Sequence, residues 1–405
     1  MSGKIAPRSH ARRRVVGGVV GGGAAVLAAT VLAATVLAVA GVAAAGGAGA
    51  STRPVSVTPA AAVPWASVGT GWVLTEYSTG TAAKPKPTTL YLVSPSGAKY
   101  AMHSWKASST TLAPPLVAWA GNKTEALLEV LAPKTFAPTG QYDELNMRTG
   151  KIATVTLAGK ANALGFTLPT GQQILGETNN VSGSPKTNMT VARYTQAGKR
   201  VKALVTEQGY GFSVSYSPNG TALAVSAANG MFLVSNAGGV LKKLPVPGVQ
   251  PPLGCTPARW WNASTILASC FPKNSGEPQL WLVPANGAKP VALTPVRKSG
   301  TDLGDLGAWQ LSSGLYLQSL GPCGTYELNK QAKNGSVSMV TVPGTVNSPI
   351  VVTASGSRLL VETGGCAGGG QLVWFNPGTH AEQWLFHTGV VDSIAYPNKE
   401  NGNMN

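Results

Sequence analysis

Residues Tyr210–Val246 read YGFSVSYSPNGTALAVSAANGMFLVSNAGGVLKKLPV, and this stretch has the pattern of four short β-strands. From Phe212 to Tyr216 bulky residues alternate with serines, which is the period of a strand with one buried face. A Pro-Asn-Gly turn and a second alternating run follow. The compact apolar run Met231–Val234 comes third, and a double glycine leads into the fourth run. The stretch therefore predicts one four-stranded antiparallel unit.

The same unit recurs along the chain. A turn glycine follows a short, largely apolar run at intervals of about 40 to 50 residues, which is the spacing of four-stranded propeller blades. These glycines are Gly97, Gly150, Gly198, Gly238, Gly287, Gly335 and Gly378. Fifty glycines, 29 prolines and only 11% charged residues also describe a β-rich chain with many turns. The sequence predicts an all-β, seven-bladed β-propeller of four-stranded blades.

The two ends of the repeat region are complementary. The first unit, which starts at Trp72, has only three strand patterns, whereas one strand pattern from Val391 is left over after the seventh unit. We therefore expect the C-terminal strand to complete blade one beside residues 72–77. Such closure removes the sheet edges that invite aggregation.

The unit at residues 215–239 resembles the WD40-like (PD40-like) repeats of the TolB type, exported bacterial propellers. The matching residues are Tyr216, Ser217, Pro218, Asn219, Gly220, Leu223, Phe232 and Gly238. In other units the turn is kept and the motif is lost. The resemblance implies a propeller fold. A better-known member of that family acts as a protein-docking platform in the periplasm, and the separate α/β domain of that member has no counterpart here.

The N-terminal 50 residues have the composition of an export signal or a membrane anchor. Basic residues precede Val15, and no charged residue occurs from Val15 to Ala50. The apolar part exceeds a signal-peptide core and suffices to cross a bilayer, although it is rich in Gly and Ala. Two alternatives stay open, an uncleaved single-pass anchor in the cytoplasmic membrane with the propeller outside, or secretion after cleavage near Ala50. Residues 51–64 are expected to form an exposed linker, and residues 65–405 the propeller.

The formal net charge of +16 constrains the partners. Within the propeller the basic residues are scattered singly or in pairs, without the clustered stripe that nucleic-acid binding requires. We therefore expect no nucleic-acid partner. A basic exterior suits an anionic membrane or a cell-wall polymer.

Four cysteines lie in the exported part of the chain, where an oxidising compartment would pair them. Cys255 and Cys270 fall at facing ends of the first two strands of blade five, so we expect them to be bonded. Cys323 and Cys366 occupy the same loop of neighbouring blades, so we expect a second bond there. Neither a Cys-x-x-Cys pair nor a nearby histidine favours the rival interpretation, a metal site.

The sequence contains no convergent catalytic constellation. His103, His380 and His387 are expected to be surface or strand-edge residues, and the chain lacks a G-x-S-x-G motif. Asp302 and Asp305 form a close pair that could bind calcium, but an ordinary Asx-rich turn is the favoured interpretation. We expect no cofactor.

Several tryptophans lie near strand ends or loops, where aromatic side chains on one propeller face would stack on a sugar or a peptide. The candidates are Trp260, Trp261 and Trp309. Because successive side chains of a strand point in opposite directions, Trp260 and Trp261 must face opposite sides. Packing between blades is the favoured role, and ligand stacking is the alternative.

These observations predict an exported, membrane-tethered and monomeric propeller. It would act as a non-catalytic platform for an envelope protein or a cell-wall polymer. The alternatives are a propeller enzyme, either hydrolase or lyase, and a carbohydrate or small-ligand sensor, both using the central channel. The enzyme question stays open, with the balance toward no catalysis.

Overall fold

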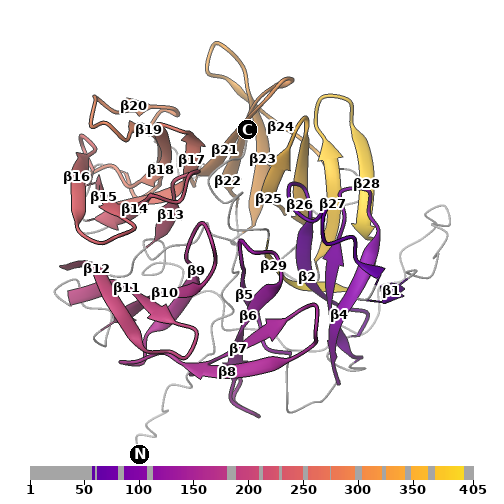
Figure 1. The fold of residues 1–405 in the computed structure, drawn as a ribbon. Helices are drawn as coiled ribbons and strands as arrows, with labels where there is room; N and C mark the ends of the chain where they lie inside the picture. Colours follow the sequence, from indigo (N-terminus) through magenta and orange to yellow (C-terminus); the bar gives the residue numbers. More distant parts are fainter. Residues whose placement is uncertain are drawn as a thin grey trace, which may run out of the picture.

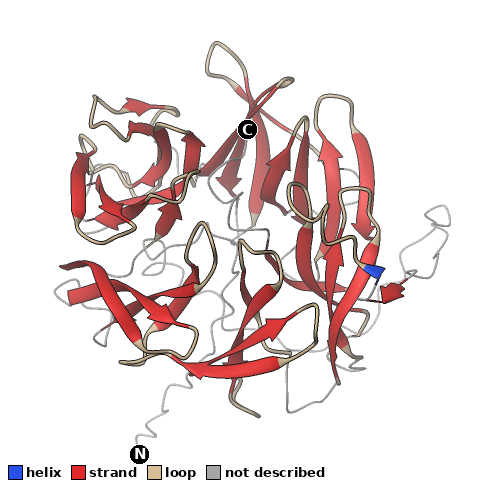
Figure 2. Cartoon of the chain, viewed as in Figure 1, coloured by secondary structure: helices blue, strands red, loops and turns tan. Residues whose placement is uncertain are grey.

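A computed structural model of the chain describes residues 57–59, 62–80, 86–106, 113–179, 188–208, 213–227, 230–249, 254–273, 275–296, 303–321, 325–342, 348–363 and 370–395. Figure 2 shows β-strand through most of these residues. Within these ranges there is no helix of the length and apolarity that crossing a membrane requires. The expected signal or anchor, residues 1–50, lies outside the described residues.

The strands form seven blades around a centre (Figure 1), as the sequence predicts. Neighbouring strands among the four of each blade pair antiparallel. From the centre outward, blade 1 contains β29 (Val390–Ala395), β2 (Val73–Ser78), β3 (Thr88–Val93) and β4 (Lys99–Trp105). Blade 2 contains β5 (Leu116–Trp119), β6 (Glu125–Leu131), β7 (Pro138–Asn146) and β8 (Ile152–Thr156). Blade 3 contains β9 (Asn162–Phe166), β10 (Gln173–Asn179), β11 (Asn188–Thr195) and β12 (Arg200–Gln208).

The other blades repeat this order. Blade 4 contains β13 (Val214–Tyr216), β14 (Ala222–Ala227), β15 (Gly230–Ser235) and β16 (Val240–Pro245). Blade 5 contains β17 (Cys255–Asn262), β18 (Thr265–Cys270), β19 (Gln279–Pro284) and β20 (Val291–Ala292). Blade 6 contains β21 (Asp305–Leu311), β22 (Gly314–Leu320), β23 (Tyr326–Gln331) and β24 (Val337–Met339). Blade 7 contains β25 (Pro349–Ser355), β26 (Arg358–Thr363), β27 (Gln371–Asn376) and β28 (Ala381–Phe386).

The ring is closed by the C-terminal strand, and this prediction is confirmed. Strand β29 pairs antiparallel with β2, with Leu74 opposite Ala395 and Ser78 opposite Val390. Ile394 is buried between blades 7 and 1. The last strand of the chain therefore becomes the innermost strand of the first blade.

Blade 1 also has a fifth strand that was not expected. Strand β1 (Val57–Pro59) pairs in parallel with the outer strand β4, with Val57 opposite Lys99. Part of the stretch expected to be an exposed linker is therefore bound to the propeller. The pairing covers part of the outer edge of blade 1, which would otherwise present free backbone groups.

The hydrophobic core lies between blades. Side chains alternate along each strand, so each blade is apolar on both faces and packs against both neighbours. Trp119 of blade 2 packs with Leu74 of blade 1, for example, and Trp374 of blade 7 packs with Val73 across the closure. Burial of apolar surface therefore holds each blade to the next around the ring.

Polar side chains reinforce these contacts at one end of the strands. Glu76 Oε2 accepts a hydrogen bond from the backbone N of Leu116, the first residue of β5. Ser269 donates to the backbone O of Asp305, the first residue of β21, and Gln318 donates to the O of Pro349, the first residue of β25. Three second strands thus bond the innermost strand of the following blade at the equivalent place.

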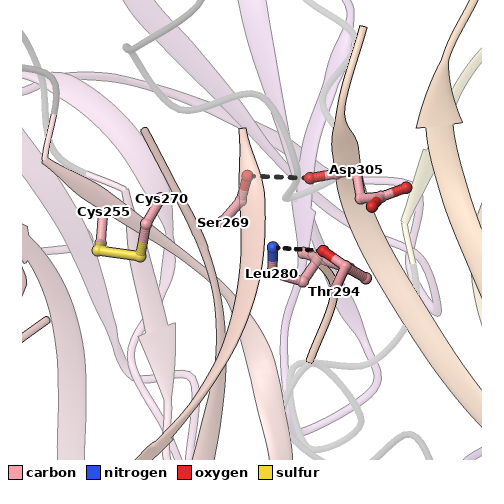
Figure 3. The surroundings of a disulfide bond; sticks show 6 residues. All are labelled: Cys255, Ser269, Cys270, Leu280, Thr294 and Asp305. Atoms are coloured by element: carbon pink, nitrogen blue, oxygen red, sulfur yellow. Dashed lines mark hydrogen bonds between the residues drawn. A yellow bond between two sulfur atoms is a disulfide. The ribbon is translucent and has the colours of Figure 1, made fainter. Parts of the chain in front are cut away.

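The disulfide between Cys255 and Cys270 is present, as the blade register predicts (Figure 3). The two residues face each other across β17 and β18, and both are fully buried. Figure 3 also shows the hydroxyl of Ser269, which is in blade 5 like the disulfide, donating to the backbone O of Asp305 in blade 6. The expected bond between Cys323 and Cys366 falls on residues outside those described.

Candidate functional site

Two of the three tryptophans for which packing was the favoured role and ligand stacking the alternative are buried. Trp260 is 2% exposed, and its indole N–H donates to the backbone O of Ser215 in blade 4. Trp309 is 3% exposed and lies between blades 6 and 7. These side chains fill the core, so they offer no binding surface, as expected of aromatic residues that face a neighbouring blade.

Trp261 is half-buried and points away from Trp260, as the alternation of side chains predicts. The buried guanidinium of Arg259 lies 5.0 Å from the centre of the Trp261 ring and 5.8 Å from that of Trp309. Arg259 also donates to the backbone O of Ala308 in blade 6. Cation–π contact and hydrogen bonding thus make Trp261 part of the joint between blades 5 and 6.

The aspartate pair, for which a turn was favoured over a calcium site, is described in the structure only at Asp305. Asp305 is fully buried, and its carboxylate accepts a hydrogen bond from Ser319 at 2.7 Å. Asp302 lies outside the described residues. Among the described residues no group of three or more His, Cys, Asp and Glu side chains could hold a metal ion. Asp305 therefore has a visible role in the packing of blade 6.

The three histidines pack against different aromatic rings. His103 lies 4.7 Å from Trp105, and His387 stacks on Trp384 at 4.3 Å. His380 has a φ of 59° in the turn after β27 and meets the edge of Phe375. Burial lowers the pKa of His103. Each histidine thus contributes to local packing.

The most distinctive surface lies at the end of the ring where the first strand of each blade turns into the second and the third turns into the fourth. We call this surface the turn face, and the opposite end the loop face. All turns of the turn face belong to the described residues, and most of them are short. The seven repeated glycines of the sequence all lie here, between the third and fourth strands.

Side-chain oxygens hold the backbone of these turns. An Asn or Ser/Thr side chain accepts a hydrogen bond from a backbone N–H two to four residues later, as in Asx-turns and their Ser/Thr equivalents. In blade 2, Asn146 accepts from Arg148 N at 3.1 Å, and in blade 5 Asn286 accepts from Ala288 N at 2.9 Å. The other acceptors are Ser94, Asn122, Thr195, Asn219, Ser235, Asn262, Asn334 and Asn376. These hydrogen bonds fix the backbone of the turns, so the residues next to them are held in defined positions.

Basic side chains gather in and beside these turns in consecutive blades. They are Lys99, Lys123, Arg148, Lys151, Arg193, Lys199, Arg200, Lys202, Lys242, Lys243, Lys289, Lys330, Lys333 and Arg358. The acidic residues of the same surface are few, namely Glu125, Asp143, Glu144 and Glu382. Other acidic residues lie toward the loop face, where the second strands end, for example Glu76, Glu129, Glu177 and Glu362. The turn face thus has a strong excess of positive charge.

Some of these lysines also connect neighbouring blades. Lys242 of blade 4 donates to the backbone O of Asn286, in the turn of blade 5, at 2.7 Å. Lys202 occupies the same strand position in blade 3, and its side chain lies against Gly238 in the turn of blade 4. The side chains of Lys202 and Lys242 contact the turn of the next blade, and both residues are nevertheless exposed. The basic surface therefore continues from blade to blade.

A carboxylate pair forms the main acidic feature of the turn face. Glu144 of β7 accepts a hydrogen bond from Gln196, in the turn of blade 3, at 2.7 Å. Burial, and secondarily the negative charge of Glu125, raise the pKa of Glu144 to about 7. Near neutral pH this carboxyl is therefore partly protonated, which reduces the negative charge that opposes the lysines.

The sequence carries a signal for this surface, which the expectation of scattered basic residues left out. The basic residues look scattered because they are far apart in the chain, yet several lie one or two positions after a turn glycine. Examples are Gly150-Lys151, Gly198-Lys199 and Gly287-Ala-Lys289. Because the propeller places equivalent turns on one face, a residue type that recurs with the blade period becomes a cluster.

Comparison with known proteins identifies the fold. No family model and no curated protein matches the chain. Among solved structures, the puromycin-hydrolyzing peptidase of Mycobacterium tuberculosis is 14% identical over 79% of this chain and 52% of its own, with a TM-score of 0.51. A puromycin hydrolase is 13% identical over 80% and 53%, with a TM-score of 0.52. TolB from Acinetobacter baumannii is 16% identical over 81% and 67%, with a TM-score of 0.43.

The chain spans about half the length of the two hydrolases it matches. At these identities a likeness establishes a shared fold and nothing about activity. The propeller fold implied by the resemblance at residues 215–239 is confirmed by the blade topology of the chain itself. What the names of the matched proteins say of catalysis applies to those proteins.

Proposed function

We propose that the chain is an exported, membrane-tethered propeller that acts as a non-catalytic interaction platform, and that its turn face binds an anionic partner in the cell envelope. The observation that carries the proposal is the convergence of basic side chains from consecutive blades on a surface of hydrogen-bonded turns. The structures matched in the comparison include both TolB and hydrolases. The proposal therefore depends on the charge distribution and not on the fold.

The chemistry of such a face favours phosphate-bearing or carboxylate-bearing surfaces. Lysine ammonium groups on a rigid ring attract a dense array of negative charge without needing a specific sequence or shape. The attraction is screened beyond roughly 8 to 10 Å at physiological salt, so it acts on partners that come close to the face. A polyanion that reaches several blades would be held more firmly than one that reaches a single turn.

A pair of matched variants tests this proposal. The first replaces three exposed turn-face lysines, as Lys151→Glu, Lys199→Glu and Lys289→Glu. The second replaces three exposed loop-face lysines, as Lys134→Glu, Lys160→Glu and Lys273→Glu. Both variants have the same net charge, so any difference between them reports the position of the charge.

The measurement is the salt concentration that elutes the full chain from immobilised polyphosphate. We expect the turn-face variant to elute at a clearly lower salt concentration than the wild type, and the loop-face variant to stay close to the wild type. Equal elution of the two variants would show that the whole surface acts through net charge, and the proposed site would be wrong.

A further inference from the structure

The place where the chain joins the propeller gives the turn face a defined direction. Strand β1 runs parallel to β4, and Val57 lies opposite Lys99, which directly follows the first turn of the turn face. Figure 1 shows β1 beside β4 at the edge of the ring. Strand β1 therefore begins at the turn-face end of blade 1 and runs toward the loop face.

The segment after β1 is fastened to the same end of the ring. Val68 and Trp72 are buried between blades 1 and 2. The guanidinium of Arg148, in the turn of blade 2, lies 5.1 Å from the centre of the half-buried Trp65 ring. The entry of the chain is therefore held by strand pairing before Trp65 and by packing after it.

The distance from the predicted membrane segment is short. The uncharged apolar stretch of the sequence ends near Ala45, a dozen positions before Val57. An extended chain covers about 3.3 to 3.6 Å per residue, so this connection reaches at most about 40 Å. A tether of that length, attached at the turn-face end of blade 1, allows the turn face to reach the bilayer.

The side chains near the entry suit a membrane surface. Trp65 and Tyr100 are both half-buried, with Tyr100 stacked on Trp72 at 5.9 Å. Tryptophan and tyrosine are enriched where a protein meets the boundary between lipid headgroups and water. Lysines and arginines beside such residues are attracted to anionic headgroups.

We propose that the turn face lies on the anionic surface of the membrane into which the N-terminal segment inserts. This inference rests on the proposed function, because it names anionic lipid headgroups as the partner of the same basic face. It also orients the molecule, because the loop face then points away from the bilayer.

The test uses the full chain reconstituted into vesicles and an amine-reactive label. One set of vesicles contains phosphatidylcholine alone, and the other contains phosphatidylcholine with phosphatidylglycerol. Mass spectrometry then compares the labelling rates of the turn-face lysines Lys151, Lys199 and Lys289 with those of the loop-face lysines Lys134, Lys160 and Lys273. All six are exposed in the structure of the chain.

We expect labelling of the turn-face lysines to slow several-fold in the vesicles with phosphatidylglycerol, and high salt to restore it. The loop-face lysines should react equally in both kinds of vesicle. Equal rates for the turn-face lysines in the two kinds of vesicle would overturn the inference, as would protection of the loop-face lysines.

The two proposals fail in different ways. One outcome is that the turn-face variant loses polyphosphate binding while anionic lipid does not protect the turn-face lysines from labelling. This result would support the basic site and reject the membrane as its partner. An anionic polymer of the wall would then be the better candidate. If polyphosphate binding is also unaffected by the turn-face substitutions, the proposed function itself is wrong.

Discussion

At the scale of single residues, the partly buried carboxyl of Glu144, which is bonded by Gln196 across blades 2 and 3, makes the stability of the protein sensitive to pH. The pKa of Glu144 is raised from its ordinary value of 4.5 to about 7, first by burial and then by the negative charge of Glu125. The folded protein therefore keeps this proton at a pH where the unfolded chain has lost it. The free energy of unfolding must fall as the pH rises from about 4.5 to about 7. At higher pH this contribution to stability remains lost.

We expect the substitution Glu144→Gln to remove this pH dependence, because an amide fills the same place without titrating. Thermal denaturation at pH 5 and pH 8 should show a smaller drop in melting temperature for the variant than for the wild type. Asp143→Asn is the control, since Asp143 is the adjacent residue of the same strand and bonds Thr154 instead. Identical pH profiles for wild type and Glu144→Gln would contradict the assignment.

A second residue-scale prediction separates two glycines that the sequence makes equivalent. Gly150 and Gly198 occupy the same turn in blades 2 and 3, with φ of 70° and 80°. A Cβ on Gly150 would meet nothing within 4 Å, whereas a Cβ on Gly198 would lie 2.0 Å from the backbone O of Thr156. Gly150→Ala should therefore lower the free energy of unfolding only by the cost of alanine in the left-handed conformation, about 1 to 2 kcal/mol.

Gly198→Ala should destabilise the protein substantially more than Gly150→Ala, because the backbone of blade 2 would have to move. Urea denaturation of the two variants measures the difference. Equal destabilisation would mean that the close approach between Gly198 and Thr156 is absent in solution.

At the scale of elements, the disulfide joins the two strands of blade 5 nearest the centre. Cys255 and Cys270 are 15 residues apart in the chain, and a bond that closes a loop of this length stabilises a protein by about 3 kcal/mol. The variant with Cys255→Ala and Cys270→Ala should lose at least that much in urea denaturation. Either single substitution should lose about as much as the pair, because each one breaks the bond. A double variant with an unchanged midpoint would show that the bond contributes nothing to stability.

At the scale of the whole molecule, closure of the ring depends on one strand. Without β29, the inner edge of β2 would be free, and Tyr77 and Leu372 of the cluster between blades 7 and 1 would lose packing partners. Free strand edges promote association between molecules. We expect a chain that ends at residue 389 to form aggregates on size-exclusion chromatography. A chain that ends at residue 395 should elute as the full chain does, and aggregation of both would assign the effect to the last ten residues instead.

The sequence was sufficient for the architecture because the repeated signal is local. Each blade is recognisable in the sequence by alternating apolar residues and by the glycine between its third and fourth strands. Seven such glycines therefore predicted seven blades. The odd strand pattern near Val391 predicted the closure, and the register of blade 5 predicted the bond between Cys255 and Cys270. Strand β1 was missed, since a three-residue parallel pairing leaves no periodic pattern to detect.

The sequence alone therefore determined the seven-bladed fold, its closure and the pairing of Cys255 with Cys270, because these follow from local strand period and from turn chemistry. Only the tertiary structure decided which side chains are exposed and which of them lie on the same face. It buried Trp260 and Trp309, which sequence reasoning had considered as binding residues, and it brought Lys151, Lys199 and Lys289 onto one face. The physical reason is that exposure and charge density depend on how blades pack around a ring, and residues that are a blade apart in the chain become neighbours only after that packing.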